Sequence, residues 1–277
     1  MTLVSDARRI GWETALYNYS KSCLAAGERR REDLRSADWL SYLPLRPDDV
    51  ALVLGCGLGT VPAALTEYCR RVVAVDRVPA RLAFLHVRSS QQRLRLHAVE
   101  GDSVLPFRPE TFDLISISAE WSQGADGFRH TVQQVAPLLK SGGYLHLNLE
   151  NRWSPMRLGR VKAEPHWQPL SAAGYAQALR VAGFCDVDIY AVLPSHDGIP
   201  LFFVPLHDSR AMAFFLRHIF PLFLMVSPEV KQAYGVQLAF AYLGVRLALA
   251  IRATALVRHF VPGFCILAKC SGADSDY

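Results

Sequence analysis

Several features that would place this chain in a special class are missing from its sequence. Its six cysteines include no Cys-x-x-Cys pair and no zinc-like spacing with histidine. It has no internal repeat, no low-complexity tract and no apolar run of the roughly 18 uninterrupted residues that a membrane span needs. The first residues lack the apolar core of a signal peptide. We therefore expect a reduced, cytoplasmic protein without a metal.

The composition is that of a folded protein with a large core. The chain has 277 residues, of which 51% are hydrophobic and 20% charged, so one large domain, or one domain with an appended cap, is expected. The net charge of +5 comes mostly from arginine, and residues 29–31 form the densest basic run. A run this short is typical of a solvated helix face, and nucleic acid is not an expected partner.

A glycine-rich turn stands at the centre of the sequence pattern. The apolar residues 50–54 have strand character and end in glycines at alternate positions, Gly55, Gly57 and Gly59, with Cys56 between the first two. A segment suited to a helix begins at once. Glycine has no Cβ, so backbone N–H groups in such a turn can approach a ligand closely. The pattern predicts a ligand-binding turn between a strand and a helix.

Two carboxylates follow the turn at distances that suit a nucleoside. Asp76 ends the apolar run 72–76, about 20 residues past the glycines, where an acidic residue typically binds ribose hydroxyls. Asp102 follows the run 95–100 and can accept a hydrogen bond from an adenine amino group. Either carboxylate alone is equally well explained as a loop or cap residue. Together with the glycine turn they predict a nucleoside site at the carboxyl ends of three parallel strands.

A nicotinamide dinucleotide is the alternative ligand for a glycine turn. The pattern Gly-x-Gly-x-x-Gly needs a sixth residue that is glycine, and the two starting points give Thr60 and Pro62 there. The turn therefore favours a different nucleoside ligand, and a nicotinamide oxidoreductase is the weaker reading.

Over residues 36–192 the chain resembles the class I S-adenosylmethionine-dependent methyltransferases, and within them a bacterial subgroup similar to methyltransferase type 11. The family usually has an acidic residue two positions before the first glycine, where this chain has Val53. The motifs that carry the resemblance are the glycine turn, Asp76, Gly101-Asp102, Phe112-Asp113-Leu-Ile-Ser-Ile, Ala119-Glu120-Trp121, Leu138-Leu-Lys-Ser-Gly-Gly-Tyr-Leu-His-Leu, Glu150-Asn-Arg152 and Ala182-Gly-Phe184.

The resemblance implies a cofactor and a fold. The cofactor is S-adenosyl-L-methionine, with the methionine part over Gly55–Gly59, the ribose at Asp76 and Arg77, and the adenine at Asp102 and Ser103. The fold is α/β, a doubly wound, seven-stranded Rossmann-like sheet with N-terminal helices over the cofactor cleft. The last strand closes the sheet in the antiparallel direction.

Four residues are candidates for the acceptor end of the site. Trp121 follows the fourth strand and can form an apolar wall, and Glu120 beside it is either a general base or acceptor ligand, or a solvated loop carboxylate. Arg152 follows the fifth strand and either binds an acceptor carboxylate or phosphate or pairs with Glu150. His166 ranks first among the histidines as a base, although a lone histidine is more often structural. His146, inside a strand, is expected in the core.

The order of predicted elements divides the chain into four parts. Residues 1–45 are N-terminal helices, 46–194 the cofactor-binding α/β core, 195–260 a helical cap insertion and 261–277 the final strand and tail. The expected helices are 5–28, 32–42, 60–70, 79–90, 127–139 and 171–181, and the expected strands are 50–54, 72–76, 95–100, 112–118, 143–149, 185–192 and 263–269. A helix stop and turn are expected at residues 140–143.

The insertion is strongly apolar at residues 212–226 and 236–251, with charges that interrupt both stretches. Packing against the core or a homodimer contact is its expected use, and peripheral membrane association or a lipid-like acceptor is the minority alternative. The expected function is methyl transfer to a small-molecule acceptor, with O-methylation favoured. A binding or scaffold protein that kept the fold without turnover is the alternative, and Val53 favours it slightly.

Overall fold

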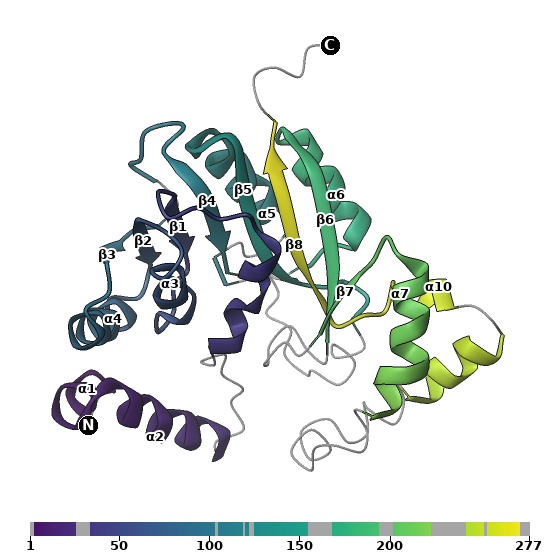
Figure 1. Ribbon diagram of the computed structural model, residues 1–277, viewed down its shortest axis with the longest axis horizontal. Coiled ribbons are helices and arrows are strands. Elements are labelled where there is room, and N and C mark those ends of the chain that lie inside the picture. The colour runs from purple at the N-terminus through teal and green to yellow at the C-terminus, as the bar shows by residue number, and fades with distance from the viewer. Residues whose placement is uncertain are drawn as a thin grey trace.

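The computed structural model describes residues 3–25, 34–102, 105–118, 120–121, 125–154, 168–193, 202–222, 242–251 and 254–271. At its centre is an eight-stranded sheet in the order β3-β2-β1-β4-β5-β8-β6-β7 (Figure 1). The strands are β1 Val50–Leu54, β2 Arg71–Asp76, β3 Leu96–Glu100, β4 Phe112–Ile117, β5 Leu139–Glu150, β6 Phe184–Leu193, β7 Phe202–Pro205 and β8 Gly263–Cys270.

The direction of the strands explains where a site can form. Strands β1 to β5 run parallel, and β8 is inserted antiparallel between β5 and β6. The chain leaves β1 toward β2 on one side and later returns to place β4 on the other. Ligands of open α/β sheets bind at such a switch point, outside the carboxyl ends of the strands. The predicted doubly wound α/β fold with an antiparallel last strand is confirmed.

Helices cover both faces of the sheet, as the alternation of side chains requires. On one face lie the 3-10 helix η1 Leu34–Tyr42, α3 Thr60–Leu65 and α4 Pro79–Gln92; on the other lie α5 Ala125–Val135, followed by the 3-10 turn η2 Ala136–Leu138, and α6 Ala172–Val181. In β5, Leu145, Leu147 and Leu149 pack against the α5 and α6 side. Successive side chains of a strand point to opposite faces, so His146 and Asn148 point to the η1 side.

Some predicted boundaries are wrong for identifiable reasons. The helix expected over 60–70 ends at Leu65, and the one expected over 5–28 is divided at Gly11, with φ 87°, into α1 Leu3–Ile10 and α2 Trp12–Ala25. The helix stop and turn expected at 140–143 belong to β5 instead. Lys140 lies 2.7 Å from the Asp113 carboxylate, which also accepts a 2.8 Å hydrogen bond from the Val50 N–H. This pair joins the starts of β1, β4 and β5.

The insertion before the last strand is only partly helical. It contributes β7, which pairs antiparallel with β6 and makes the sheet eight-stranded rather than seven-stranded. Its helix α7 Ser209–Phe214 begins at Asp208, whose carboxylate accepts from two backbone N–H groups that hold the pKa of this carboxyl below its ordinary value. The helix continues as a π-helical turn, η4 Phe215–Ile219, and residues 242–250 and α10 Thr254–Val257 are also helical.

Part of the insertion packs on the main core and part of it faces outward. Met212, Phe215 and Leu216 are buried in the same cluster as α5 and α6. Several large apolar side chains of the insertion are exposed instead; they are Leu243, Leu247, Ile251, Leu256 and Phe260. Among the described helices, none has both the length and the apolar character that crossing a membrane requires.

The N-terminal helices are attached to the glycine turn through a buried arginine. Arg88 of α4 is 2% exposed, and its Nη1 donates to the Leu58 carbonyl oxygen at 3.1 Å. The Trp12 ring of α2 lies over its guanidinium at 4.2 Å. Leu58 itself packs with Ala7 and Leu16. The turn that follows β1 is therefore bonded to α4 through Arg88, and it packs against α1 and α2 through Leu58.

Replacing Arg88 by methionine should lower the free energy of unfolding by about 2–4 kcal/mol, because the Leu58 carbonyl loses a charge-assisted donor while staying buried. Urea unfolding followed by circular dichroism measures it. The control is Arg95→Met, at an exposed position, which should change the free energy by no more than about 0.5 kcal/mol. Equal effects of both substitutions would contradict the role given to Arg88.

Candidate functional site

The glycine turn after β1 requires glycine for two separate reasons. Gly55 and Gly59 have φ angles of 75° and 89°, in the left-handed region. A Cβ on Gly55 would lie 2.1 Å from Ser118 Oγ, and one on Gly59 would lie 2.3 Å from Leu85 Cδ1. Neither position has room for a side chain. The predicted strand, turn and helix are confirmed, and the turn lies at the switch point between β1 and β4.

Asp76 holds this turn in place. The residue is 2% exposed, and its Oδ2 accepts a 2.9 Å hydrogen bond from the Gly57 N–H. Oδ1 accepts a 2.9 Å hydrogen bond from the Val78 N–H, which orients the chain as it enters α4. A buried carboxylate with two backbone donors connects the ends of β1 and β2. The sequence placed Asp76 beside the turn correctly, but gave no indication of these bonds.

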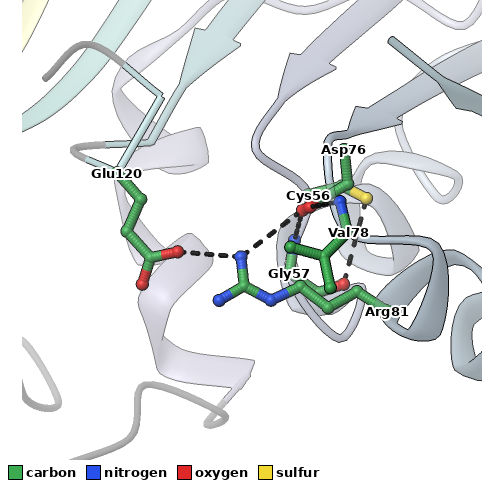
Figure 2. Close-up of polar contacts among 6 residues, drawn as sticks. All are labelled: Cys56, Gly57, Asp76, Val78, Arg81 and Glu120. Carbon is green, nitrogen blue, oxygen red and sulfur yellow. Dashed lines mark hydrogen bonds and ion pairs between the residues drawn. The ribbon is translucent and has the colours of Figure 1, made fainter. Parts of the chain in front are cut away.

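An arginine that the sequence analysis did not single out connects the two sides of the site. Arg81, in the first turns of α4, donates from Nη1 to Glu120 Oε2 at 2.8 Å and lies 3.7 Å from Asp76 Oδ2. Figure 2 shows its guanidinium between the two carboxylates. Glu120 comes from the turn after β4, so the pair spans the carboxyl edge of the sheet. The helical position of Arg81, five residues past Asp76, was the available signal.

A second arginine makes a parallel connection. Arg77 Nε lies 2.6 Å from Asp102 Oδ1, and its guanidinium lies 4.4 Å from the centre of the Trp121 ring. It also donates to the Trp121 carbonyl at 3.3 Å. Trp121 is 5% exposed, whereas the Asp102 side chain is 74% exposed. The structure thus brings together the predicted residues Arg77, Asp102 and Trp121, and Glu120 lies next to them.

The remaining candidates lie elsewhere or outside the description. Arg152 is exposed, with its guanidinium over the Trp153 ring at 5.5 Å, and Glu150 is buried. Ser103 and His166 lie outside the described residues. In the described part of the chain, no group of three or more histidine, cysteine or acidic residues is arranged to hold a metal ion. Burial raises the pKa of the Cys69 thiol to about 12 and also raises that of Cys265.

His146 is a core residue, as expected from its place in a strand. Its ring stacks on Trp39 of η1 with centroids 3.4 Å apart, and its Nδ1 shares a 2.9 Å hydrogen bond with Ser116 Oγ. Burial lowers the pKa of His146 to about 3, so the imidazole is neutral at physiological pH. A histidine this hard to protonate is a poor general base.

Comparison with known proteins agrees with this architecture. Residues 52–147 match the family model described as a methyltransferase domain, a range that includes the glycine turn, Asp76, Asp102 and Glu120. No curated protein matches the chain in sequence. Many solved structures match the chain, and the three described below are 14–15% identical to it, which shows the fold alone.

Three of these structures show how different the proteins with this fold are. Phosphoethanolamine N-methyltransferase 2 of Haemonchus contortus, solved with phosphomonomethylethanolamine and S-adenosylhomocysteine, aligns with a TM-score of 0.57 and 14% identity over 98% of this chain and 61% of that chain. The YcgJ protein of Bacillus subtilis aligns at 0.51 and 15% over 86% and 99%. The [4+2]-cyclase SpnF aligns at 0.51 and 15% over 93% and 94%.

Asp76→Asn should lower the free energy of unfolding by about 1–3 kcal/mol, because an amide presents one oxygen where the carboxylate presents two to the Gly57 and Val78 N–H groups. Thermal or urea unfolding measures the change. Asp102→Asn is the control: it weakens an exposed ion pair and should cost no more than about 0.5 kcal/mol. A stable Asp76→Asn protein would show that the turn is held by other contacts.

The buried imidazole predicts a pH dependence of stability. The unfolded chain binds a proton at His146 below about pH 6.5, and the folded protein does not until about pH 3, so stability falls as the pH falls through this window. The slope is up to about 1.4 kcal/mol per pH unit for one histidine. Unfolding of the wild type and His146→Gln between pH 7 and 5 should show a flatter slope in the variant. The exposed-site control His97→Gln should keep the wild-type slope.

Proposed function

We propose that this chain, whose residues 52–147 match a methyltransferase domain, is a class I S-adenosylmethionine-dependent methyltransferase that transfers the methyl group of this cofactor to a hydroxyl oxygen of a small-molecule acceptor. The observation that carries the proposal is the glycine turn at the switch point, held against the end of β2 by the Asp76 carboxylate. This arrangement places backbone N–H groups and a buried carboxylate together at the carboxyl edge of the sheet. Such a site suits a nucleoside with a charged tail.

The cofactor roles follow from this geometry. The methionine part lies over Gly55, Cys56, Gly57 and Gly59, where the glycines present backbone N–H groups and no Cβ of their own. Asp76 binds the ribose hydroxyls with the lone pairs that remain, since each carboxylate oxygen has two and the backbone donors use one on each. The bond to Gly57 therefore positions the carboxylate for ribose rather than consuming it.

The adenine end of the site is formed by the second ion pair. Asp102, with Ser103 beside it, accepts a hydrogen bond from the adenine amino group, and Arg77 keeps Asp102 directed toward the edge of the sheet. The Arg77 guanidinium lies over the Trp121 ring, 4.4 Å from its centre, and this cation–π contact forms part of that edge. Binding of the nucleoside thus competes with, or rearranges, an ion pair that is already formed.

The chemical step needs alignment and a route for one proton. The acceptor oxygen forms a bond to the methyl carbon as the bond from that carbon to the sulfonium sulfur breaks, and S-adenosylhomocysteine leaves. The hydroxyl proton passes to a carboxylate or to water. Glu120 is the proposed base, at the edge beside Trp121, and it must first exchange its bond to Arg81. His166 is the other proposed base, and Arg152 is proposed to hold a polar part of the acceptor.

The rival function is a protein that keeps this fold without methyl transfer. Val53 is 3% exposed and packs in the cluster that contains Trp39, so the position where the family usually has an acidic residue supplies no carboxylate here. The likeness to a [4+2]-cyclase shows that the fold by itself does not determine the reaction. Cofactor affinity and turnover must therefore be measured separately.

The chain is proposed to consist of four parts with different roles. Residues 1–45 are proposed to cover the cofactor, consistent with the contact of α1 and α2 with Leu58. Residues 46–194 form the cofactor-binding core, residues 195–260 the cap and residues 261–277 the last strand and tail. The exposed apolar side chains of the insertion suit a homodimer contact, with a lipid-like acceptor or membrane surface as the alternative. The proposed location is the cytoplasm.

Isothermal titration with S-adenosylmethionine and S-adenosylhomocysteine tests the proposal. We expect micromolar binding of both to the wild type, a loss of at least about tenfold in Asp76→Ala, and no more than about a twofold change in the exposed-site control Asp186→Ala. Transfer of labelled methyl to hydroxyl-bearing acceptors then tests turnover. Binding without transfer to any acceptor would favour the rival function, and absence of binding would sink the cofactor assignment.

A further inference from the structure

Polar side chains form a row on the η1 side of β4 and β5, where a core face would normally be apolar. Ser116 of β4 is paired in register with His146 of β5, and Ile117 with Leu147. Ser118 continues the ladder, because its N–H donates to the Leu54 carbonyl at 2.9 Å. Ser118 and Asn148 each lie two residues further along, on the same face and opposite each other. Four polar side chains thus occupy two neighbouring strands, all near the carboxyl edge.

Three atoms of this row are buried and lack a hydrogen-bond partner within the described part of the chain: Ser118 Oγ, His146 Nε2 and Asn148 Oδ1. Trp39, whose ring stacks on His146, has a buried Nε1 that likewise lacks a hydrogen-bond partner among the described residues. Each such group destabilises the fold relative to a satisfied one, and native proteins contain few of them. A cluster of them in one place indicates that a polar group from outside the fold completes it.

The row begins beside the glycine turn, where the methionine part of the cofactor is proposed to lie. Ser118 Oγ is the atom that a Cβ on Gly55 would strike, so this hydroxyl touches the glycine turn. Asn148 lies on the next strand, about 5 Å further. Beyond it, Tyr190 of β6 lies across Cys265 of β8, and its ring is 5.1 Å from that of Tyr42 of η1. Polar atoms and aromatic rings thus follow one another away from the turn.

We propose that Ser118, His146 and Asn148 bind the reacting polar group of the acceptor, and that they select an uncharged group that carries an O–H or N–H. This inference rests on the proposed methyl transfer and names the acceptor class for the same site. Asn148 Oδ1 can only accept a hydrogen bond, so the ligand must donate one. A carboxylate or phosphate dianion has no proton to donate and would lose its hydration here. A hydroxyl donates its one proton to Asn148 Oδ1 and accepts from Ser118 Oγ or from the Nε2–H tautomer of His146.

The role of His146 in this site is positioning. Its Nδ1 is engaged with Ser116 and its ring is held by Trp39, so Nε2 is directed in a fixed plane. A neutral ring in that position donates one hydrogen bond from its Nε2–H to the acceptor oxygen, and it removes no proton from the acceptor. Alignment of the acceptor oxygen with the methyl group would then come from three fixed atoms, which is the larger part of what an in-line transfer requires.

A matched pair of serines tests the claim that these atoms await a ligand. Ser116 lies in β4 and Ser118 just past its end on the same face, and of the two only Ser116 Oγ has a hydrogen-bond partner within the described part of the chain. Ser116→Ala should lower the melting temperature of the ligand-free protein, whereas Ser118→Ala should leave it unchanged or raise it, since it removes an unsatisfied group. A fall of equal size in both variants would show that Ser118 has a structural partner, and would overturn the proposal.

The acceptor class is tested with four probes that share one ring: phenol, benzoate, phenyl phosphate and benzylamine. Each is titrated into protein saturated with S-adenosylhomocysteine, with binding followed by ligand-observed NMR. We expect phenol to bind at least about tenfold more tightly than the two anions and the ammonium ion. Asn148→Leu should lose phenol binding by a similar factor and keep its affinity for S-adenosylhomocysteine within about twofold.

The results separate this inference from the function on which it rests. The inference is overturned if benzoate, phenyl phosphate or benzylamine binds more tightly than phenol, or if no probe binds. It is also overturned if Asn148→Leu binds phenol as tightly as the wild type does. Failure of S-adenosylhomocysteine to bind the wild type would instead contradict the proposed function. The comparison of Ser116→Ala with Ser118→Ala needs no ligand, so it tests the polar row in either case.

Discussion

The arrangement of the site depends on one short contact, between the Asp76 carboxylate and the Gly57 N–H. Gly55, Gly57 and Gly59 of the turn have left-handed φ angles and no side chains, so bonds from neighbouring elements help to set their position. Asp76 does this from β2, and Arg88 does it from α4 through the Leu58 carbonyl. Both are buried and charge-assisted, so the turn is rigid although it consists largely of glycine. The same carboxylate is proposed to bind ribose, so the group that shapes the site also recognises the ligand.

Charge at the edge of the sheet is organised by two arginines that neutralise carboxylates from different strands. Arg81 connects Asp76 with Glu120, and Arg77 connects Asp102 with Trp121 and its turn. Asp76, Glu120, Asp102 and Trp121, which a ligand would contact, are therefore each already engaged by one of the two arginines. A cofactor that binds here must exchange some of these existing bonds, which lowers its net affinity. Together with Val53 in place of an acidic residue, this suggests a site whose affinity depends on what else is bound.

In contrast to these paired charges, the polar row on β4 and β5 contains groups that have no hydrogen-bond partner within the described part of the chain. Ser118, His146 and Asn148 carry buried atoms that lower the stability of the ligand-free fold. Apolar residues in these positions would pack without that cost. Functional sites commonly keep such groups at the expense of stability, because a ligand satisfies them when it arrives. A conventional search of the sequence for paired acid and base residues passes over this row, since serine and asparagine in a strand give no signal.

The sequence by itself determined the alternation of strands and helices, the glycine turn, and the placement of Asp76 and Asp102, because these follow from local periodicity and from residues with special backbone freedom. It also placed His146 in the core. Only the tertiary structure decided which charges meet: Arg81 and Glu120 are 39 positions apart in the chain and bond at 2.8 Å. It likewise decided that residues 140–143 belong to β5, because the partner of Lys140 is Asp113 on another strand, and that β7 extends the sheet from within the insertion. Contacts between distant segments depend on how strands are ordered and registered, and local sequence carries no record of that order.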